Sequence, residues 1–187
     1  MTAPDDDRHL MDRIVALDEA ALRTLVARYH VRLHRYVARL TRNEAVAEEV
    51  INEVFHDAWR NARSFEGRSS VFTWLVSIAH NKSVSILRKR REAEWDEEKA
   101  SAIADDQDDP EVVTQKHDKG AQIRACMLEL SPEHREIIDL VYYHEQSVGE
   151  IAAALAIPEA TVKTRMFYAR KRLGELLKAR GIDRGWP

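Results

Sequence analysis

The stretch that most constrains the fold of this chain spans residues 147–172, where the spacing of apolar residues predicts two short helices joined by a tight turn. The first helix is expected to begin at Ser147, because Ser147 and Glu150 have the spacing of a capping box, in which each side chain accepts a hydrogen bond from a backbone N–H. Ile157 and Pro158 should end that helix and start the next, since proline disfavours helix before it and is tolerated in a first turn. This pattern is typical of a helix-turn-helix.

The second predicted helix separates an apolar face from a polar one. A period of 3.6 residues places four apolar residues on the inner face: Val162, Met166, Ala169 and Leu173. The outer face carries basic, hydroxyl and aromatic side chains, which suit the major groove of DNA. The candidate DNA-contacting residues of this helix are Thr161, Lys163, Thr164, Arg165, Phe167, Tyr168, Arg170 and Lys171.

These outer residues differ in what they can contact. Lys163 and Thr164 lie early in the helix, where a recognition helix meets base edges, and the rings of Phe167 and Tyr168 can lie against a thymine methyl group or a sugar. The remaining basic residues are better placed for phosphates, whose contacts give affinity and register but little sequence choice. The alternative is an ordinary helical hairpin whose charged face is solvated. The capping box, the turn and the two outward aromatic residues favour DNA contact.

Composition favours helices and limits the kind of protein. The chain has 187 residues, 33% of them charged, and only six glycines, which indicates one or two mainly helical domains. Its net charge of −3 argues against a protein that coats DNA uniformly, but residues 88–91 and 163–180 are locally basic and residues 92–109 are acidic. The single Cys126 excludes an internal disulfide and a cysteine-based zinc site. With no apolar run long enough to span a bilayer and no signal peptide at its acidic start, the chain is expected to be cytoplasmic.

The first half of the chain predicts a bundle of three helices. Apolar residues recur at three and four from Leu22 to Leu40, and Asn43 can cap a second helix with the same pattern up to Trp59. Glycine and serines mark a loop at residues 64–70, after which Ser70 can cap a third helix. These helices must bury their apolar stripes against one another.

The second half predicts a smaller helical domain after a linker. Periodicity fails from residue 93 to about residue 117, where a run of aspartates favours solvation over packing. Ser131, Pro132 and Glu133 then have the order of a helix start. The predicted fold is therefore all-α, with an N-terminal helical bundle at residues 10–92, a flexible acidic linker at 93–117 and a C-terminal helix-turn-helix domain at 118–181.

Several motifs resemble the extracytoplasmic-function (ECF) sigma factors of bacterial RNA polymerase, in the sigma-70 superfamily. Residues 130–173 are similar to the domain that binds the −35 promoter element, and the usual Gly-Thr-Val-Lys-Ser-Arg of that family stands here as Ala-Thr-Val-Lys-Thr-Arg from Ala160. Residues 47–59 resemble the helix that docks on the polymerase. Residues 69–91 resemble the segment that reads and opens the −10 element, with Phe-Thr-Trp-Leu from Phe72. The match covers nearly the whole chain.

Two departures from the family pattern lie in the first half. The docking helix commonly carries Asp-Leu-Val-Gln-Glu, and this chain has Glu-Val-Ile-Asn-Glu from Glu49, which keeps the acid and amide character. The family often has an aspartate four residues after its asparagine, whereas this chain has Ser85 after Asn81. The resemblance therefore implies docking on the polymerase, with a changed polar surrounding of Asn81.

The resemblance also implies roles for particular residues. The polymerase-binding residues, which would face the clamp helices of the largest subunit, are Glu49, Asn52, Glu53 and Asp57. The residues that would hold an unstacked −10 base or line the DNA are Phe65, Arg68, Ser69, Phe72, Asn81, Lys82, Arg88 and Lys89. Core packing is an equal alternative for Phe72.

The implied partners are core RNA polymerase (clamp helices and flap), promoter DNA and an anti-sigma factor, with no cofactor, metal or membrane insertion. His30 and His34 lie four residues apart, but no complete set of metal ligands accompanies them. No catalytic motif supports an enzyme. The alternative functions are a different helix-turn-helix regulator, such as a repressor or response-regulator output domain, and a protein-interaction adaptor that binds no promoter.

Overall fold

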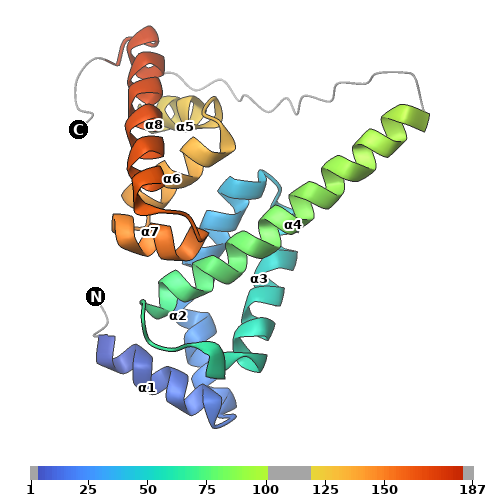
Figure 1. Cartoon of the computed structure of the whole chain (residues 1–187), viewed down its shortest axis with the longest axis vertical. Coiled ribbons are helices and arrows are strands. Elements are labelled where there is room, and N and C mark those ends of the chain that lie inside the picture. Colours follow the sequence, from blue (N-terminus) through green and yellow to red (C-terminus); the bar gives the residue numbers. More distant parts are fainter. Residues whose placement is uncertain (1–3, 101–118, 183–187) are drawn as a thin grey trace.

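The computed structural model describes residues 4–100 and 119–182 and is helical throughout its regular parts (Figure 1). The helices in chain order are α1 (Pro4–Val15), α2 (Glu19–Thr41), α3 (Glu44–Arg60), the short 3₁₀ turn η1 (Ala62–Ser64), α4 (Val71–Ala100), α5 (Lys119–Leu128), α6 (Pro132–Tyr142), α7 (Val148–Leu155) and α8 (Glu159–Ala179). No strand occurs within those two ranges. The predicted all-α class is confirmed.

Helices α1 to α4 form the N-terminal domain. The apolar stripe of α2 includes Leu25 and Leu33, both fully buried, and it packs against α3 and α4. The side chain of Asn43 accepts a hydrogen bond from the backbone N–H of Val46 at 3.0 Å, so the predicted cap of α3 is present. Helix α1 was not predicted as a separate helix; it packs on α2 and buries Leu10, Met11 and Ile14.

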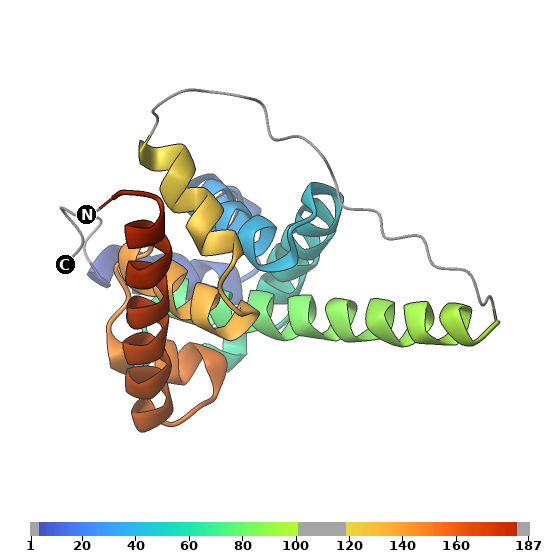
Figure 2. The same cartoon turned by 90° about the horizontal axis from the view of Figure 1, so that it is seen from above.

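Helix α4 is longer than the sequence pattern predicts. It continues to Ala100, so residues 93–100, which were assigned to the linker, are helical. Residues 88–100 contain no glycine or proline and many glutamates, lysines and arginines, which are good helix formers even without an apolar stripe. Figures 1 and 2 both show the C-terminal part of α4 projecting away from the other helices. The rest of the predicted linker, residues 101–117, lies outside the described residues.

Helices α5 to α8 form the C-terminal domain. The hydroxyl oxygen of Ser131 caps α6, and Pro132 occupies its first turn. The capping box of Ser147 and Glu150 is present at the start of α7, as predicted. Helix α7 ends at Leu155, and α8 follows directly after Pro158. Helix α8 packs against α5, α6 and α7, so the second helix of the helix-turn-helix is held along its length.

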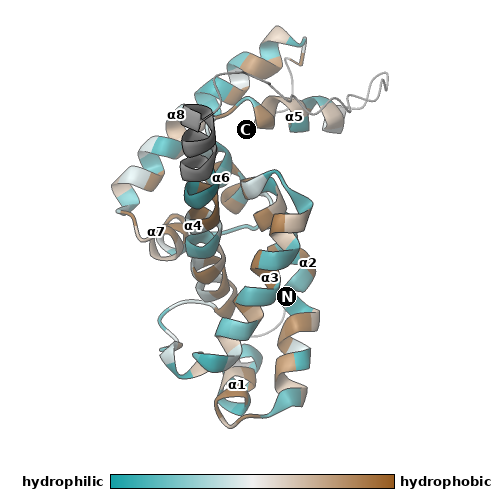
Figure 3. Cartoon of the chain, turned by 90° about the vertical axis from the view of Figure 1, so that its right-hand side faces the viewer, coloured by the Kyte–Doolittle hydropathy of each residue, from teal (hydrophilic) through white to brown (hydrophobic). Residues whose placement is uncertain are grey.

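The two domains pack against each other. Helix α7 lies against α4 and α6 lies against α2, which brings the buried Ile137, Leu140 and Ile151 into one continuous apolar core with the N-terminal helices. Figure 3 shows α7 as hydrophobic over much of its length, as expected for a helix between two others. A smaller cluster around Cys126 and Leu173 joins α5 to α8. The sequence pattern identified two helical domains, but it did not predict this docking.

Candidate nucleic-acid interface

The outer face of α8 presents the predicted DNA-contacting side chains to solvent. The inner residues Val162, Ala169 and Leu173 are fully buried, while Phe167 is 63% exposed and Tyr168 is 53% exposed. The outward side chains that are exposed are Lys163, Thr164, Phe167, Tyr168, Arg170 and Lys171, and those that are half-buried are Thr161 and Arg165. The predicted division into two faces is confirmed.

Local contacts orient several of these outward side chains. The Thr164 hydroxyl donates to the carbonyl of Ala160 at 2.9 Å. Because its hydrogen is used in this bond, the Thr164 hydroxyl oxygen can only accept a hydrogen bond from a DNA base. The rings of Phe167 and Tyr168 meet edge to face with centroids 5.4 Å apart, which stiffens an exposed aromatic pair. Nζ of Lys163 lies 3.5 Å from a carboxylate oxygen of Glu159. This exposed ion pair is weak, so a phosphate or a base can take the place of Glu159.

The loop between η1 and α4 borders a cavity of about 260 Å³ between itself and α1. Phe65 lines this cavity and also packs against Trp74, with ring centroids 5.5 Å apart. Gly67 has φ 69°, a left-handed conformation that favours glycine in this turn. Arg68 is exposed and forms an ion pair with Glu66, and Ser69 is half-buried. The loop thus combines an aromatic surface, a cation and a cavity in one place.

Phe72 is a packing residue here, which corrects its assignment as a base contact. Its side chain is only 3% exposed. The guanidinium of Arg32 lies 3.6 Å from the centre of its ring, and the ring of His144, from the C-terminal domain, lies at 5.5 Å. The neighbouring Thr73 hydroxyl donates to the side-chain oxygen of Gln146 at 2.8 Å. The segment between α6 and α7 therefore covers the start of α4.

The exposed face of α3 is acidic, as predicted. Glu49, Asn52 and Glu53 are exposed and Asp57 is half-buried, while Val50, Ile51 and Val54 on the opposite face are fully buried. An acidic surface of this kind can steer a basic partner and set its register.

Lys82 lies against that acidic face. Its Nζ lies 2.9 Å from a carboxylate oxygen of Glu53 and 2.8 Å from one of Asp57. Burial alone would lower the pKa of Lys82, but its hydrogen bonds with the two carboxylates raise it above the ordinary value. The structure therefore joins a residue predicted for the −10 element to two residues predicted for the polymerase. Three other predicted residues of α4 are exposed: Asn81, Arg88 and Lys89.

The histidine pair of α2 lies against acidic side chains of α3. The rings of His30 and His34 stack with centroids 6.0 Å apart, and Nε2 of His34 lies 3.3 Å from Glu48 and 3.5 Å from Glu44. Among the described residues, no group of three histidine, cysteine or acidic side chains could hold a metal ion.

Sequence reasoning missed a set of polar residues between the two domains. Tyr36 of α2 and His80 of α4 both bond to Glu136 of α6. Arg39 of α2 pairs with Asp139, one turn further along α6. The available signal was that Glu136 and Asp139 interrupt a run of apolar residues in a helix that must bury that face.

Comparison with known proteins assigns both halves. Residues 25–93 match Sigma-70 region 2 and residues 120–173 match Sigma-70 region 4. The chain is 32% identical over 173 residues to the ECF RNA polymerase sigma factor SigL of Mycobacterium tuberculosis, covering 90% of this chain and 96% of that protein. The chain belongs to the ECF sigma factors. It is also 27% identical over 176 residues to the ECF sigma factor SigK of Mycolicibacterium vanbaalenii, covering 92% of this chain and 88% of that one.

Solved structures with the same fold agree with this assignment. This sigma factor is similar to CnrH in complex with the cytosolic domain of CnrY, with 25% identity, a TM-score of 0.68 and coverage of 92% of this chain and 97% of that chain. It is similar to RpoE of Bartonella quintana in complex with the anti-sigma factor NepR, with 25% identity, a TM-score of 0.70 and coverage of 87% and 98%. A repressor or response-regulator output domain is not favoured. No helix in the described parts of the sigma factor could cross a membrane.

Proposed function

We propose that this sigma factor grips a promoter at two points with two separate domains. The outer face of α8 binds the −35 element, and the loop at residues 64–70 with the exposed residues of α4 engages the −10 element. The observation that best supports this is the aromatic and basic outer face of α8, whose inner face is buried in the C-terminal domain. The functional units proposed are residues 10–92 and 118–181, joined through residues 93–117.

The acidic face of α3 is the proposed contact with core RNA polymerase. Glu49, Asn52, Glu53 and Asp57 would meet the clamp helices of the largest subunit, and the C-terminal domain would meet the flap. Opposite charge increases the rate of encounter and fixes register more than it adds affinity. The ion pairs of Lys82 with Glu53 and Asp57 would link polymerase docking to the helix that follows the −10 loop.

The −10 loop is proposed to hold a base swung out of the DNA stack. Such a pocket requires a surface for stacking, backbone hydrogen-bonding groups and nearby positive charge. The cavity beside Phe65 supplies the stacking surface, and the exposed Arg68 supplies the positive charge. The protein contributes binding and orientation, with no bond-making chemistry of its own.

Promoter binding by both domains is proposed to require their separation. Phe72 and Thr73 lie under the segment between α6 and α7, so the start of α4 is closed to DNA in the docked arrangement. One similar solved structure is of CnrH with the cytosolic domain of CnrY, and another is of the sigma factor RpoE with the anti-sigma factor NepR. We therefore expect a cytoplasmic anti-sigma partner that favours the docked arrangement, and release from it would open the start of α4 to DNA.

Reconstitution tests this function. The full chain is combined with core RNA polymerase and a promoter library, and run-off transcripts are sequenced. We expect transcripts from one class of promoter that share −35 and −10 elements. Transcripts at the level of core polymerase alone, while the chain still binds duplex DNA, would contradict the proposal and point to a repressor.

A further inference from the structure

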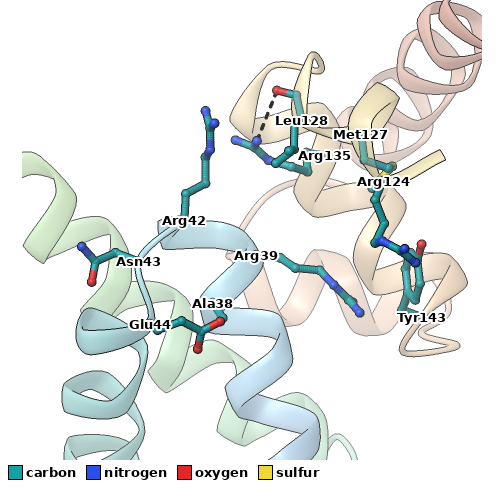
Figure 4. Close-up of a pocket in the computed structure, with 10 residues that line it drawn as sticks. All are labelled: Ala38, Arg39, Arg42, Asn43, Glu44, Arg124, Met127, Leu128, Arg135 and Tyr143. Carbon is teal, nitrogen blue, oxygen red and sulfur yellow. Dashed lines mark hydrogen bonds between the residues drawn. The ribbon is translucent and has the colours of Figure 1, made fainter. Parts of the chain in front are cut away.

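A cavity of about 400 Å³ lies between the two domains, at the junction of α2 and α3 on one side and at α5 and α6 on the other (Figure 4). This volume falls within the range of pockets that hold small organic ligands. Four arginines from both domains line it: Arg39, Arg42, Arg124 and Arg135. None of the predicted DNA-binding or polymerase-binding residues lines this cavity, so it is separate from those surfaces.

Arg135 is the buried cation of the cavity. It is only 7% exposed, and its Nε is fully buried without a hydrogen-bond partner. Among the described residues its one hydrogen bond is a long one of 3.5 Å, from a terminal nitrogen to the carbonyl of Leu128, drawn in Figure 4. A buried guanidinium whose donors are not satisfied destabilises a protein unless a ligand or water accepts from them. The donors of Arg135 therefore lack an acceptor that a ligand could supply.

The charges around Arg135 are unbalanced. Arg39 is neutralised by Asp139, and it lies 4.1 Å from the centre of the Tyr143 ring. Arg42, by contrast, is exposed and has no ion pair with any described residue. Burial, and then the like charge of Arg42, lower the pKa of Arg135. One carboxylate, that of Glu44, also lines the cavity, and it lies 3.5 Å from His34.

Apolar side chains line the cavity beside these cations. Leu128 is 49% exposed and Tyr143 is 46% exposed, although both are large, and Met127 also lines the cavity. A ligand that satisfies both kinds of side chain carries an anionic group and a carbon skeleton. A free inorganic ion would leave the apolar side chains uncovered.

We propose that this cavity binds a small organic anion, whose phosphate or carboxylate is held by Arg42 and Arg135 and whose apolar body lies on Leu128 and Tyr143. Because the cavity has walls from both domains, a bound anion stabilises their docking and opposes their separation. The site would thus couple a metabolite of this chemical class to promoter access.

The fluorescent dye 8-anilinonaphthalene-1-sulfonate is a suitable probe, since its sulfonate stands in for the phosphate or carboxylate and its rings for the apolar body. The full chain contains four methionines, and of the three in the described residues only Met127 lines the cavity. With ¹³C-labelled methionine methyl groups, we expect a saturable shift of the Met127 signal at one dye per chain. The signals of Met11 and Met166 stay in place. N-phenyl-1-naphthylamine, which has the same rings without the sulfonate, should bind about tenfold more weakly.

Variants locate the anion. Arg42 ends α2 in a left-handed conformation with φ 55°, which asparagine also adopts readily, so Arg42→Asn removes the charge and keeps the cap. This variant should weaken dye binding about fivefold or more, given the strength of charge-assisted hydrogen bonds. Arg60→Gln, at the far end of α3 and exposed, is the matched control and should bind normally.

Competition identifies the class of anion. If inorganic pyrophosphate displaces the dye, the anionic group of the ligand is a phosphate. If citrate displaces it, the group is a carboxylate. The proposal is overturned if the Met127 signal does not move, if Arg42→Asn binds as well as the unaltered chain, or if the uncharged dye binds equally. Failure of both anions to displace the dye also overturns it. None of these measurements depends on transcription.

Discussion

The hydroxyl of Tyr36 in the N-terminal domain donates a hydrogen bond to the carboxylate of Glu136 in the C-terminal domain. Both side chains are buried, at 1% and 7% exposure, and Nδ1 of His80 lies 2.7 Å from the same carboxylate oxygen. Buried polar groups cost free energy unless they are paired. The Glu136 carboxylate has these hydrogen-bond partners only while the two domains are docked in this register. It makes the docking of the two domains specific.

A double-mutant cycle measures this contact. Tyr36→Phe removes the donor from a buried charged acceptor and should lower the free energy of unfolding by about 1.5 to 3 kcal/mol. Combined with Glu136→Gln, the cycle should give a coupling energy of about 0.5 kcal/mol or more, measured by urea denaturation of the full chain.

The matched control for that cycle is Tyr168→Phe. It removes the same hydroxyl from a ring that is 53% exposed, and the change should stay within about 0.5 kcal/mol. Additive effects of Tyr36→Phe and Glu136→Gln would show that the two side chains do not interact.

The same contact predicts a dependence on alkaline pH. Burial first, and then the charge of Glu136, raise the pKa of Tyr36 well above its ordinary value of 10.0. The folded chain therefore keeps this proton after the unfolded chain has lost it. The stabilising contribution is complete below pH 10.0 and is lost as pH rises above that value, at up to about 1.4 kcal/mol per pH unit.

Tyr36→Phe isolates that contribution from the other titrating groups. Thermal or urea unfolding of both proteins between pH 8 and 11 should show the difference between them shrinking as pH rises above the ordinary tyrosine value. A difference that stays constant over this range would mean that Tyr36 keeps an ordinary pKa in the folded chain.

The sequence was most informative where local chemistry decides the outcome. The cap of Ser147 with Glu150 and the division of α8 into two faces follow from short-range spacing, and the structure confirms both. The docking of α7 on α4 and the burial of Phe72 depend on which faces of separate domains meet, and no local pattern encodes that. The extension of α4 to Ala100 was missed because charged residues with high helix propensity leave no apolar period to detect.

The outer face of α8 predicts a separation of stability from DNA binding. Lys163→Ala and Phe167→Ala alter exposed side chains and should change the free energy of unfolding by no more than about 0.5 kcal/mol. Both should weaken binding to a −35 duplex, by about 1 to 3 kcal/mol where a base contact is lost. Lys178→Ala, an exposed change in the last turn of the same helix, is the control. Fluorescence anisotropy at fixed salt provides the measurement, and undiminished affinity of both variants would remove α8 from the interface.

The −10 loop predicts a defect in strand opening. Arg68→Ala removes an exposed cation, and Phe65→Ala removes the stacking surface beside the cavity. With base stacking contributing about 1 to 3 kcal/mol, the double variant should slow open-complex formation more than it weakens binding to core polymerase. Permanganate footprinting follows the opened thymines, and Arg35→Ala, which alters an exposed arginine of α2, serves as control. Normal opening in the double variant would place base capture elsewhere.

The acidic face of α3 predicts an effect on polymerase binding that depends on salt. Glu49→Lys reverses the charge of an exposed residue, so the fold should be unaffected. Because opposite charges steer encounter, the association rate with core polymerase should fall about tenfold at low salt, and the difference should shrink as salt rises. Glu19→Lys at the start of α2, a side chain 77% exposed and on another helix, is the matched control. Surface plasmon resonance with immobilised core polymerase separates the two rates. Equal association rates for the Glu49 and Glu19 variants at low salt would show that α3 does not face the polymerase.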